Sequence, residues 1–316
     1  MPRGVAAAAT VNVGPVGKPA GPASTRRGVS LDHRMSGLTL ARMTNLQLAV
    51  SILLVLVLAM SALSAPPPGE GGAKAALEKS PRHGEWVDVQ VAGAEVPVRS
   101  YVVYPETKDK APVVIVIHEI FGLTDWIRSV ADQLAADGFI AIAPDLLSGM
   151  GPNGGGTEAF ASRDDVTKAV RGLDAAKVDA GLNAVRAYGL KLPAANGKVA
   201  TVGFCWGGGQ SFRYATTQPE LAAAVVYYGT SPAPEALANV KAPVLGHYGG
   251  DDARVNATID PAKAEMAKLG KTYEPNIYDG AGHGFLRQQD GRDGANKRAA
   301  EKAWPKTVEF IRKHAK

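Results

Sequence analysis

Cysteine is almost absent from this chain of 316 residues, which holds one, Cys205. A single thiol excludes any disulfide within the chain, and an unpaired cysteine in an exported protein needs a chemical explanation. Histidine is also scarce, with six residues, and these do not stand with Cys205 at the spacing of a metal-binding cluster. We therefore expect neither a metal nor a cofactor.

Most of the chain has no net charge, although the whole chain has a formal net charge of +5. Residues 1–65 hold six basic residues and one acidic residue, a net charge of +5, so residues 66–316 sum to zero. A nucleic-acid-binding surface needs basic residues clustered on the folded domain. The composition therefore excludes a nucleic-acid partner.

A long apolar run occurs once, at residues 48–60, within a leader that ends near residue 65. Arg34 and Arg42 precede the run and small residues follow it, which is typical of a secretory signal cleaved near Ser64 or Ala65. We expect export to the periplasm or the exterior. The alternative is an uncleaved helix, and membrane attachment would then come through this segment alone.

The rest of the chain divides into a short connection and one domain. Residues 66–83 are rich in Pro, Gly, Ala and Lys, which predicts a flexible linker. Over residues 84–316 short apolar runs alternate with amphipathic stretches, which predicts a single α/β domain. Its sheet should be doubly wound, mostly parallel and flanked by helices. The expected strands lie at residues 85–91, 96–104, 113–117, 139–143, 199–202, 223–228, 244–248 and 272–278.

The most informative stretch is Gly203–Gly209, in which Cys205 follows an apolar run and precedes a helical stretch. Glycines stand two positions before and two positions after Cys205, as in the strand-to-helix turn called a nucleophile elbow. This turn needs neighbours without bulk, and it places the central side chain at a helix N-terminus, which favours negative charge. The alternative is a glycine-rich turn that contains a buried, inert cysteine.

Polar residues follow three other expected strands, and parallel strands end at one edge of a sheet. His283 follows the last strand, Asp251 and Asp252 follow the one before it, and Glu119 follows the first parallel strand. The chain order nucleophile, acid, histidine is that of α/β-hydrolases, in which the acid orients the histidine that moves the proton. Each residue alone could be an ordinary loop residue, but together with Cys205 they favour a catalytic constellation.

Two backbone N–H groups are expected to stabilise an oxyanion. They belong to Trp206, directly after Cys205, and to Ile120, in the loop after the first parallel strand. Two aromatic residues near these groups, Phe121 and Tyr228, could line a pocket for the acyl group. They could equally be core aromatics.

From about residue 86 to its end, the chain resembles the dienelactone hydrolase (carboxymethylenebutenolidase) family of α/β-hydrolases. The resemblance rests on five motifs: His118-Glu-Ile-Phe-Gly122, Pro144-Asp-Leu146, Gly203-Phe-Cys-Trp-Gly-Gly208, His247-Tyr-Gly-Gly-Asp-Asp252 and Gly282-His-Gly-Phe-Leu-Arg287. It implies an α/β-hydrolase fold and an acyl-enzyme mechanism.

The resemblance also implies roles for single residues. It selects Asp252 rather than Asp251 as the acid, and it makes Glu119 the group that accepts the thiol proton as substrate arrives. Family enzymes that hydrolyse dienelactone hold the substrate carboxylate with two arginines. Arg287 matches one of them, and Gly149 stands at the position of the other.

These features predict a cysteine-dependent hydrolase of a lactone or small carboxylic ester, acting as a monomer on a small-molecule substrate. One alternative is a hydrolase of a thioester or a peptide-like amide. The other is a non-catalytic binding or redox-sensing protein on the same scaffold, which would show thiol chemistry without turnover.

Overall fold

The computed structural model describes residues 64–316. The apolar run at residues 48–60, with the predicted signal or membrane anchor, lies outside the described residues. Within residues 64–316 no helix combines the length and the apolar character needed to cross a membrane.

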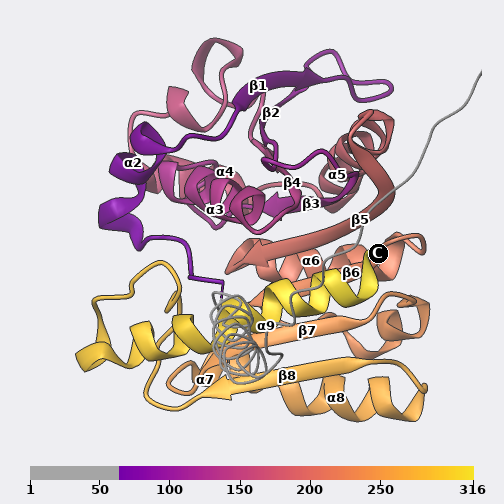
Figure 1. Cartoon of the computed structure of the whole chain (residues 1–316). Helices are drawn as coiled ribbons and strands as arrows, with labels where there is room; N and C mark the ends of the chain where they lie inside the picture. The colour runs from indigo at the N-terminus through magenta and orange to yellow at the C-terminus, as the bar shows by residue number, and fades with distance from the viewer. Residues whose placement is uncertain (1–63) are drawn as a thin grey trace, which may run out of the picture. The chain divides into compact units, whose positions relative to one another are not determined.

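One eight-stranded sheet forms the centre of the domain (Figure 1). Its strands are β1 (Gly84–Val89), β2 (Val98–Val103), β3 (Ala111–Ile117), β4 (Ile140–Pro144), β5 (Ala195–Phe204), β6 (Ala223–Tyr227), β7 (Val244–Gly249) and β8 (Tyr273–Tyr278). They are ordered β1-β2-β4-β3-β5-β6-β7-β8. Strands β3 to β8 are parallel, whereas β2 pairs antiparallel with β1 and β4. The prediction of a mostly parallel sheet is confirmed.

Helices cover both faces of this sheet. The α-helices are α2 (Glu70–Lys79), α3 (Asp125–Ala136), α4 (Arg163–Arg171), α5 (Ala175–Lys191), α6 (Trp206–Thr217), α7 (Ala253–Asn256), α8 (Ile259–Lys268) and α9 (Ala295–His314). Four short 3-10 helices lie at Pro152–Gly154, Thr157–Ala159, Pro234–Asn239 and Arg292–Gly294. Helices α3 and α9 share a core with one face of the sheet, and α5, α6 and α8 share a core with the other. This layering is the predicted doubly wound arrangement.

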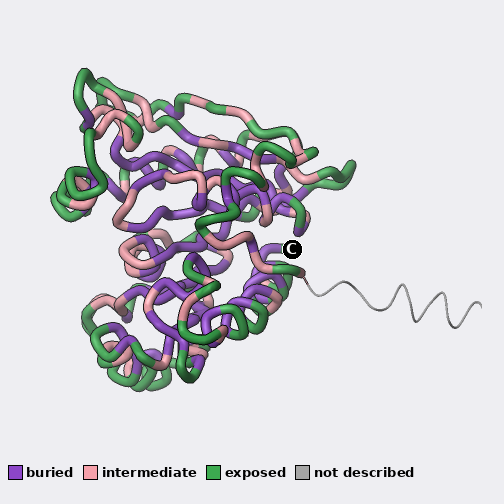
Figure 2. Tube along the Cα trace, turned by 90° about the vertical axis from the view of Figure 1, so that its left-hand side faces the viewer, coloured by how far each residue is buried: buried purple, intermediate pink, exposed green. Residues whose placement is uncertain are grey.

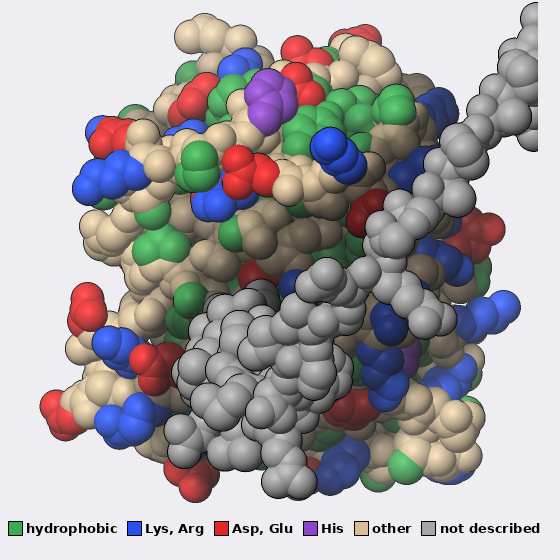
Figure 3. Space-filling model, in the orientation of Figure 1, with side chains coloured by type: hydrophobic (Ala, Val, Ile, Leu, Met, Phe, Trp, Pro, Cys, Tyr) green, Lys and Arg blue, Asp and Glu red, His purple; other side chains and the backbone are tan. Residues whose placement is uncertain are grey.

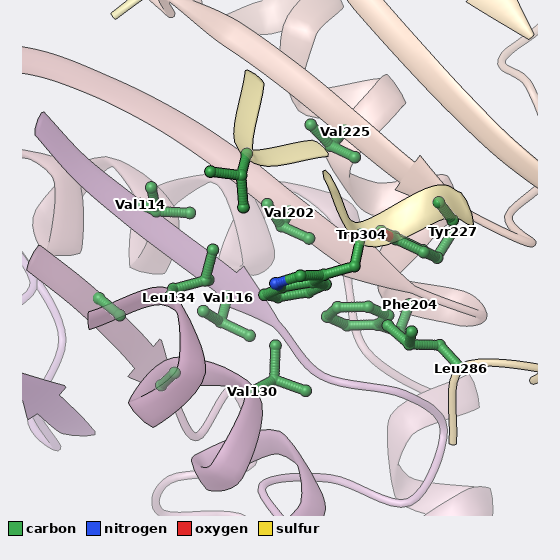
Figure 4. Close-up of a cluster of buried hydrophobic side chains, with 14 of the residues drawn as sticks. Val114, Val116, Val130, Leu134, Val202, Phe204, Val225, Tyr227, Leu286 and Trp304 are labelled. Atoms are coloured by element: carbon green, nitrogen blue, oxygen red, sulfur yellow. The ribbon is translucent and has the colours of Figure 1, made fainter. Parts of the chain in front are cut away.

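The core on the α3 face is organised around Trp304 of α9 (Figure 4). Its ring is fully buried beside Val114, Val116 and Val202 of β3 and β5, and its Nε1 donates to an oxygen of Asp137 at 2.9 Å. The edge strand β8 is buried only at its two ends, whereas β3 to β7 are buried through most of their length (Figure 2). Burial on both faces explains why their sequences are continuous apolar runs rather than alternating ones.

Local sequence signals mark both ends of helix α3. The Thr124 hydroxyl accepts a hydrogen bond from the Ile127 N–H at 3.4 Å, and the helix ends at Ala136. Two residues later Gly138 has a φ of 92°, a left-handed conformation that residues with a Cβ rarely adopt.

Residues 66–83 differ from the predicted flexible linker, because ten of them form α2. Ala73 of α2 is 1% exposed and belongs to the core beneath α3. Just before the helix, the Pro68 carbonyl accepts a hydrogen bond from Trp126 Nε1 at 3.1 Å, and after it Arg82 pairs with Asp132 at 2.5 Å. The linker prediction was wrong because it weighed the Gly and Pro content of the segment, whereas packing onto α3 decides its conformation.

Charged side chains of both signs are interspersed over the face shown in Figure 3. This pattern agrees with a net charge of zero over residues 66–316. Polar side chains that matter for chemistry gather instead where β3, β5, β7 and β8 end.

Candidate active site

The turn between β5 and α6 holds Cys205 in an unusual backbone conformation, with φ 54° and ψ −115°. A Cβ on Gly203 would lie 1.9 Å from the Gly207 carbonyl oxygen, and one on Gly207 would lie 2.3 Å from the Ile117 carbonyl oxygen. Side chains at either position would therefore collide with backbone. The elbow predicted from the glycine spacing is present, and its strain is imposed by close packing.

Three side chains line up at the ends of β5, β7 and β8. Cys205 Sγ lies 3.1 Å from His283 Nε2, and His283 Nδ1 lies 2.5 Å from Asp252 Oδ2. Asp252 is 8% exposed, whereas Asp251 is half-exposed and pairs with Arg292 at 2.6 Å. The structure therefore brings Asp252, and not Asp251, to the histidine.

Backbone N–H groups approach the thiol as predicted. Those of Trp206 and Ile120 hydrogen-bond to Cys205 and lower the pKa of its thiol. Ile120 reaches this position because β3 and β5 are neighbours, with Ile117 opposite Gly203. Two converging N–H groups can stabilise a thiolate, and they can equally stabilise the oxyanion of a tetrahedral intermediate.

The thiol is nevertheless protonated at neutral pH. Burial raises the pKa of Cys205 to about 11, and the negative charge of Glu119 adds to the rise. The N–H groups of Trp206 and Ile120 and the positive charge of Arg254 oppose it only in part. A buried neutral thiol is a poor nucleophile until its proton is removed.

Glu119, at the end of β3, is 3% exposed and ionises near neutral pH. Burial raises the pKa of its carboxyl to about 7, against the lowering effect of Arg287. The Arg287 Nε lies 2.7 Å from Glu119 Oε2, close enough for an ion pair, although its N–H is not aligned as a hydrogen-bond donor. The Glu119 carboxyl can therefore gain or lose its proton near neutral pH.

Arg287 contacts a second carboxylate, that of Glu70 in α2. Its side chain is 10% exposed, so two negative groups enclose one nearly buried guanidinium. Burial lowers the pKa of Arg287, but Glu119 and Glu70 outweigh it and raise the pKa above its ordinary value. Arg287 is not among the residues that line the cavity at Cys205.

A cavity of about 610 Å³ opens over Cys205 and His283. Tyr228 lines this cavity, and its φ is 41°. Its buried hydroxyl has no hydrogen-bond partner within residues 64–316. The Tyr228 and His283 rings lie 5.2 Å apart. Phe121 lies outside the cavity lining, where the guanidinium of Arg163 stacks 3.8 Å from its ring centroid. Tyr228 is thus placed as the sequence predicts for a pocket residue, and Phe121 is not.

Gly149 lies away from this cavity. Its φ is 80°, and a Cβ there would lie 3.0 Å from the side chain of Val96, in a separate hollow beside β2 and α5. Glycine has no side chain, so position 149 supplies no group that could hold a substrate anion beside Cys205.

Four charged residues near the site escaped the sequence analysis. Arg171, Arg213 and Arg254 line the cavity, and Glu70 reaches Arg287 from α2. They come from four separate helices, and no local motif marks them. Within residues 64–316 no group of three His, Cys, Asp or Glu side chains is arranged to hold a metal ion.

The profile of the Dienelactone hydrolase family matches residues 98–315. The chain belongs to this family. The Saccharolobus solfataricus protein named "Putative carboxymethylenebutenolidase" is 32% identical over 69% of this chain and 95% of its own length. The Bradyrhizobium protein named "Probable 2-oxo-3-(5-oxofuran-2-ylidene)propanoate lactonase" is 30% identical over 73% of this chain and 94% of its own length.

Solved structures agree with this assignment. A structure titled "Putative Dienelactone Hydrolase from Klebsiella pneumoniae" has a TM-score of 0.64 and 27% identity, over 73% of this chain and 98% of that one. The α/β-hydrolase fold is therefore confirmed. With the family and its named relatives, the chain is a hydrolase that acts on lactone or ester bonds.

Proposed function

We propose that this enzyme hydrolyses a lactone or small carboxylic ester through an acyl-enzyme on Cys205. The observation that carries the proposal is the geometry of the thiol, with Sγ 3.1 Å from His283 Nε2 and two backbone N–H groups directed at it. A nucleophile, a base and oxyanion donors thus meet at one atom, as acyl transfer requires.

In the first half of the proposed reaction, His283 takes the thiol proton while Sγ attacks the carbonyl carbon. An S–C bond forms, and the electron pair of the carbonyl moves to its oxygen, which the N–H groups of Ile120 and Trp206 stabilise. The intermediate collapses when the C–O bond to the leaving group breaks and His283 gives its proton to the departing oxygen. Asp252 keeps Nδ1 of His283 protonated and stabilises the imidazolium.

In the second half, water gives a proton to His283 and its oxygen attacks the thioester carbon. The S–C bond then breaks, the acid leaves, and Cys205 recovers its proton. Glu119 controls how readily the thiol loses this proton, because its charge raises the pKa of Cys205. Its role as an acceptor of the thiol proton stays a prediction. The Tyr228 hydroxyl, which has no hydrogen-bond partner among residues 64–316, could donate to a polar group of the substrate.

The test is hydrolysis of p-nitrophenyl acetate by the full chain and by Cys205→Ala. We expect Cys205→Ala to lose about 10³-fold or more of kcat, because no other side chain replaces the nucleophile. Asp252→Asn should lose about 10⁴-fold of kcat, because His283 then adopts the wrong tautomer. The matched control is Asp251→Asn, which alters a half-exposed neighbour and should retain activity.

Mass spectrometry of the acid-quenched reaction should find one acyl group on the peptide that contains Cys205. Turnover by Cys205→Ala at the wild-type rate would contradict the proposal. The predicted export and the predicted monomeric state are separate proposals, which the N-terminal sequence of the mature protein and its mass in solution would test.

A further inference from the structure

His118 is a buried histidine beside the site that the proposed reaction does not use. It is fully buried and follows Ile117, the last residue of β3. Glu119 and Ile120, which both act on the thiol, come directly after it in the chain. A buried polar ring costs free energy unless its nitrogens find partners. The contacts of this ring therefore indicate what it does.

One nitrogen of the His118 ring holds a backbone carbonyl. Nδ1 lies 2.7 Å from the Glu119 carbonyl oxygen, and Nδ1 must carry the proton because a carbonyl oxygen only accepts. Burial lowers the pKa of the ring, against the negative charge of Asp145, so the ring is neutral at neutral pH. Its other nitrogen, Nε2, is buried without a hydrogen-bond partner among residues 64–316. The one N–H group of this imidazole is therefore used on the Glu119 carbonyl.

The carbonyl that His118 holds belongs to the same peptide group as the Ile120 N–H. This peptide is trans, so it is planar and its C=O and N–H bonds point in opposite directions. The Glu119 carbonyl accepts from His118 Nδ1 and from the Gly122 N–H at 3.1 Å. On the opposite side of the peptide, the Ile120 N–H hydrogen-bonds to Cys205. Holding the carbonyl therefore fixes the direction of one oxyanion donor.

The same ring contacts the residue that supplies the second donor. The rings of His118 and Trp206 are stacked, with centroids 5.4 Å apart and planes inclined by 18°. Trp206 is the first residue of α6, and Gly207 after it packs against the His118 carbonyl, where a Cβ would lie 2.3 Å from the oxygen. His118 thus lies between the loop after β3 and the start of α6, the two segments that carry the oxyanion donors.

We propose that His118 is a positioning residue that directs the N–H groups of Ile120 and Trp206 at the oxygen of the reacting carbonyl. Its Nδ1–H holds the Ile120 peptide, and its ring packs against the first residue of α6. His118 does not line the cavity over Cys205, so it acts through these two residues. The inference rests on the proposed acyl transfer. Its effect belongs to the step in which the oxyanion forms, and so to kcat rather than KM.

The test compares His118→Leu with His118→Asn, two variants of nearly the same size and shape. Both lose the ring and its contact with Trp206, but asparagine keeps an N–H donor at the place of Nδ1 along the side chain. On p-nitrophenyl acetate, His118→Leu should lose about 10²-fold of kcat and keep KM within about threefold, because one oxyanion donor is misdirected. His118→Asn should recover about tenfold of that loss, because its donor can still hold the Glu119 carbonyl.

Alkylation of Cys205 by iodoacetamide gives a second measurement that needs no turnover. The Ile120 N–H lowers the pKa of this thiol. If that N–H is misdirected, His118→Leu should react about tenfold more slowly than His118→Asn at pH 8. Glu119 and Arg254, the charged side chains that act on the thiol, remain in both variants. The chain has one thiol, so its loss reports on this site alone.

His247→Leu is the control for a general loss of stability. His247 is also fully buried, and its ring contacts Tyr278 and Thr307, which do not line the cavity. This variant should lose stability and keep the wild-type kcat and alkylation rate. Thermal unfolding of all three variants sets an assay temperature at which each is folded.

Equal kcat values for His118→Leu and His118→Asn, or a loss that appears in KM alone, would overturn the inference. The proposed function fails by a different result, namely ester hydrolysis that survives Cys205→Ala. The alkylation comparison reports on His118 in either case.

Discussion

Cys205 shows how its surroundings set the chemistry of one side chain. The elbow buries the thiol and so raises its pKa, while the N–H groups of Ile120 and Trp206 prepare the same atom to carry negative charge. A thiol that rests protonated is also less open to oxidation than a thiolate. The site therefore combines a protected resting state with donors that act once charge develops.

Removing the charge of Glu119 should make the resting thiol more reactive. In Glu119→Gln the second cause of the raised pKa of Cys205 disappears, so the pKa of the thiol falls. Below that pKa the thiolate fraction rises about tenfold for each unit by which the pKa falls. The rate of alkylation by iodoacetamide, followed against pH, measures this fraction directly.

The difference between Glu119→Gln and wild type should grow above about pH 7, where the Glu119 carboxyl of the wild type is ionised. At lower pH that carboxyl is neutral, and the two proteins should react alike. Equal alkylation rates at pH 8 would show that the charge of Glu119 does not reach the thiol.

Sequence reasoning found the site residues that a local pattern marks. Cys205 stands between spaced glycines and His283 at a strand end in the chain order of the fold, whereas only the resemblance to the family selected Asp252 over Asp251. Glu70 had no such mark. Its place at the site depends on where α2 packs, which is set by contacts more than 200 positions apart in the chain.

At the scale of elements, the elbow is fixed by the approach of two backbones. Helix α6 begins directly after Cys205, and its first turn packs against the end of β3. The N–H group of Ile120 comes from the loop that follows β3. The fit between α6 and β3 therefore determines both the strain at Cys205 and the position of one oxyanion donor.

Gly207→Ala should break this fit. The added Cβ would lie 2.3 Å from the carbonyl oxygens of Ile117 and His118, which are backbone atoms and cannot turn aside. We expect a loss of about 3 kcal/mol or more in the free energy of unfolding, measured in urea, together with a loss of ester turnover.

Gly209→Ala is the matched control two positions along the same helix. There the nearest neighbour of an added Cβ is the Thr230 hydroxyl at 3.4 Å, and alanine is favoured over glycine inside a helix by about 0.5–1 kcal/mol. This variant should be as stable as wild type or more stable. Equal losses in both variants would contradict the packing argument.

The strands and α2 illustrate what sequence can predict about elements. The run Val113–Ile117 is β-branched and apolar throughout, so propensity and burial favour the same structure, and β3 forms where expected. In α2 the local sequence disfavours a helix, because Gly71 and Gly72, which have low helix propensity, lie in its first turn. Its stability comes from Ala73 and α3, a tertiary contact that composition does not reveal.

At the scale of the whole molecule, two buried ionisable groups give stability opposite dependences on pH. Burial lowers the pKa of His247 to about 3, and its ring contacts the hydroxyls of Tyr278 and Thr307 at 2.9 and 3.1 Å. Burial raises the pKa of Glu119 to about 7. The folded protein holds both groups neutral where the unfolded chain would charge them.

The sign of each effect follows from proton uptake. Below about pH 6.5 the unfolded chain protonates His247 but the folded protein does not, so stability falls as the pH drops towards 3. Above about pH 4.5 the unfolded chain ionises Glu119 first, so stability falls as the pH rises towards 7. Between about 4.5 and 6.5 the two contributions oppose each other.

His247→Gln should therefore change how steeply the free energy of unfolding depends on pH, and not only the size of that free energy. Between about pH 6.5 and 3, the free energy of unfolding of the wild type should fall by up to about 1.4 kcal/mol per pH unit more than that of the variant. Urea unfolding at a series of pH values measures both slopes. His83→Gln, at a side chain 71% exposed, is the control and should keep the wild-type slope. Parallel curves for His247→Gln and wild type would mean that the folded protein protonates this histidine as readily as the unfolded chain does.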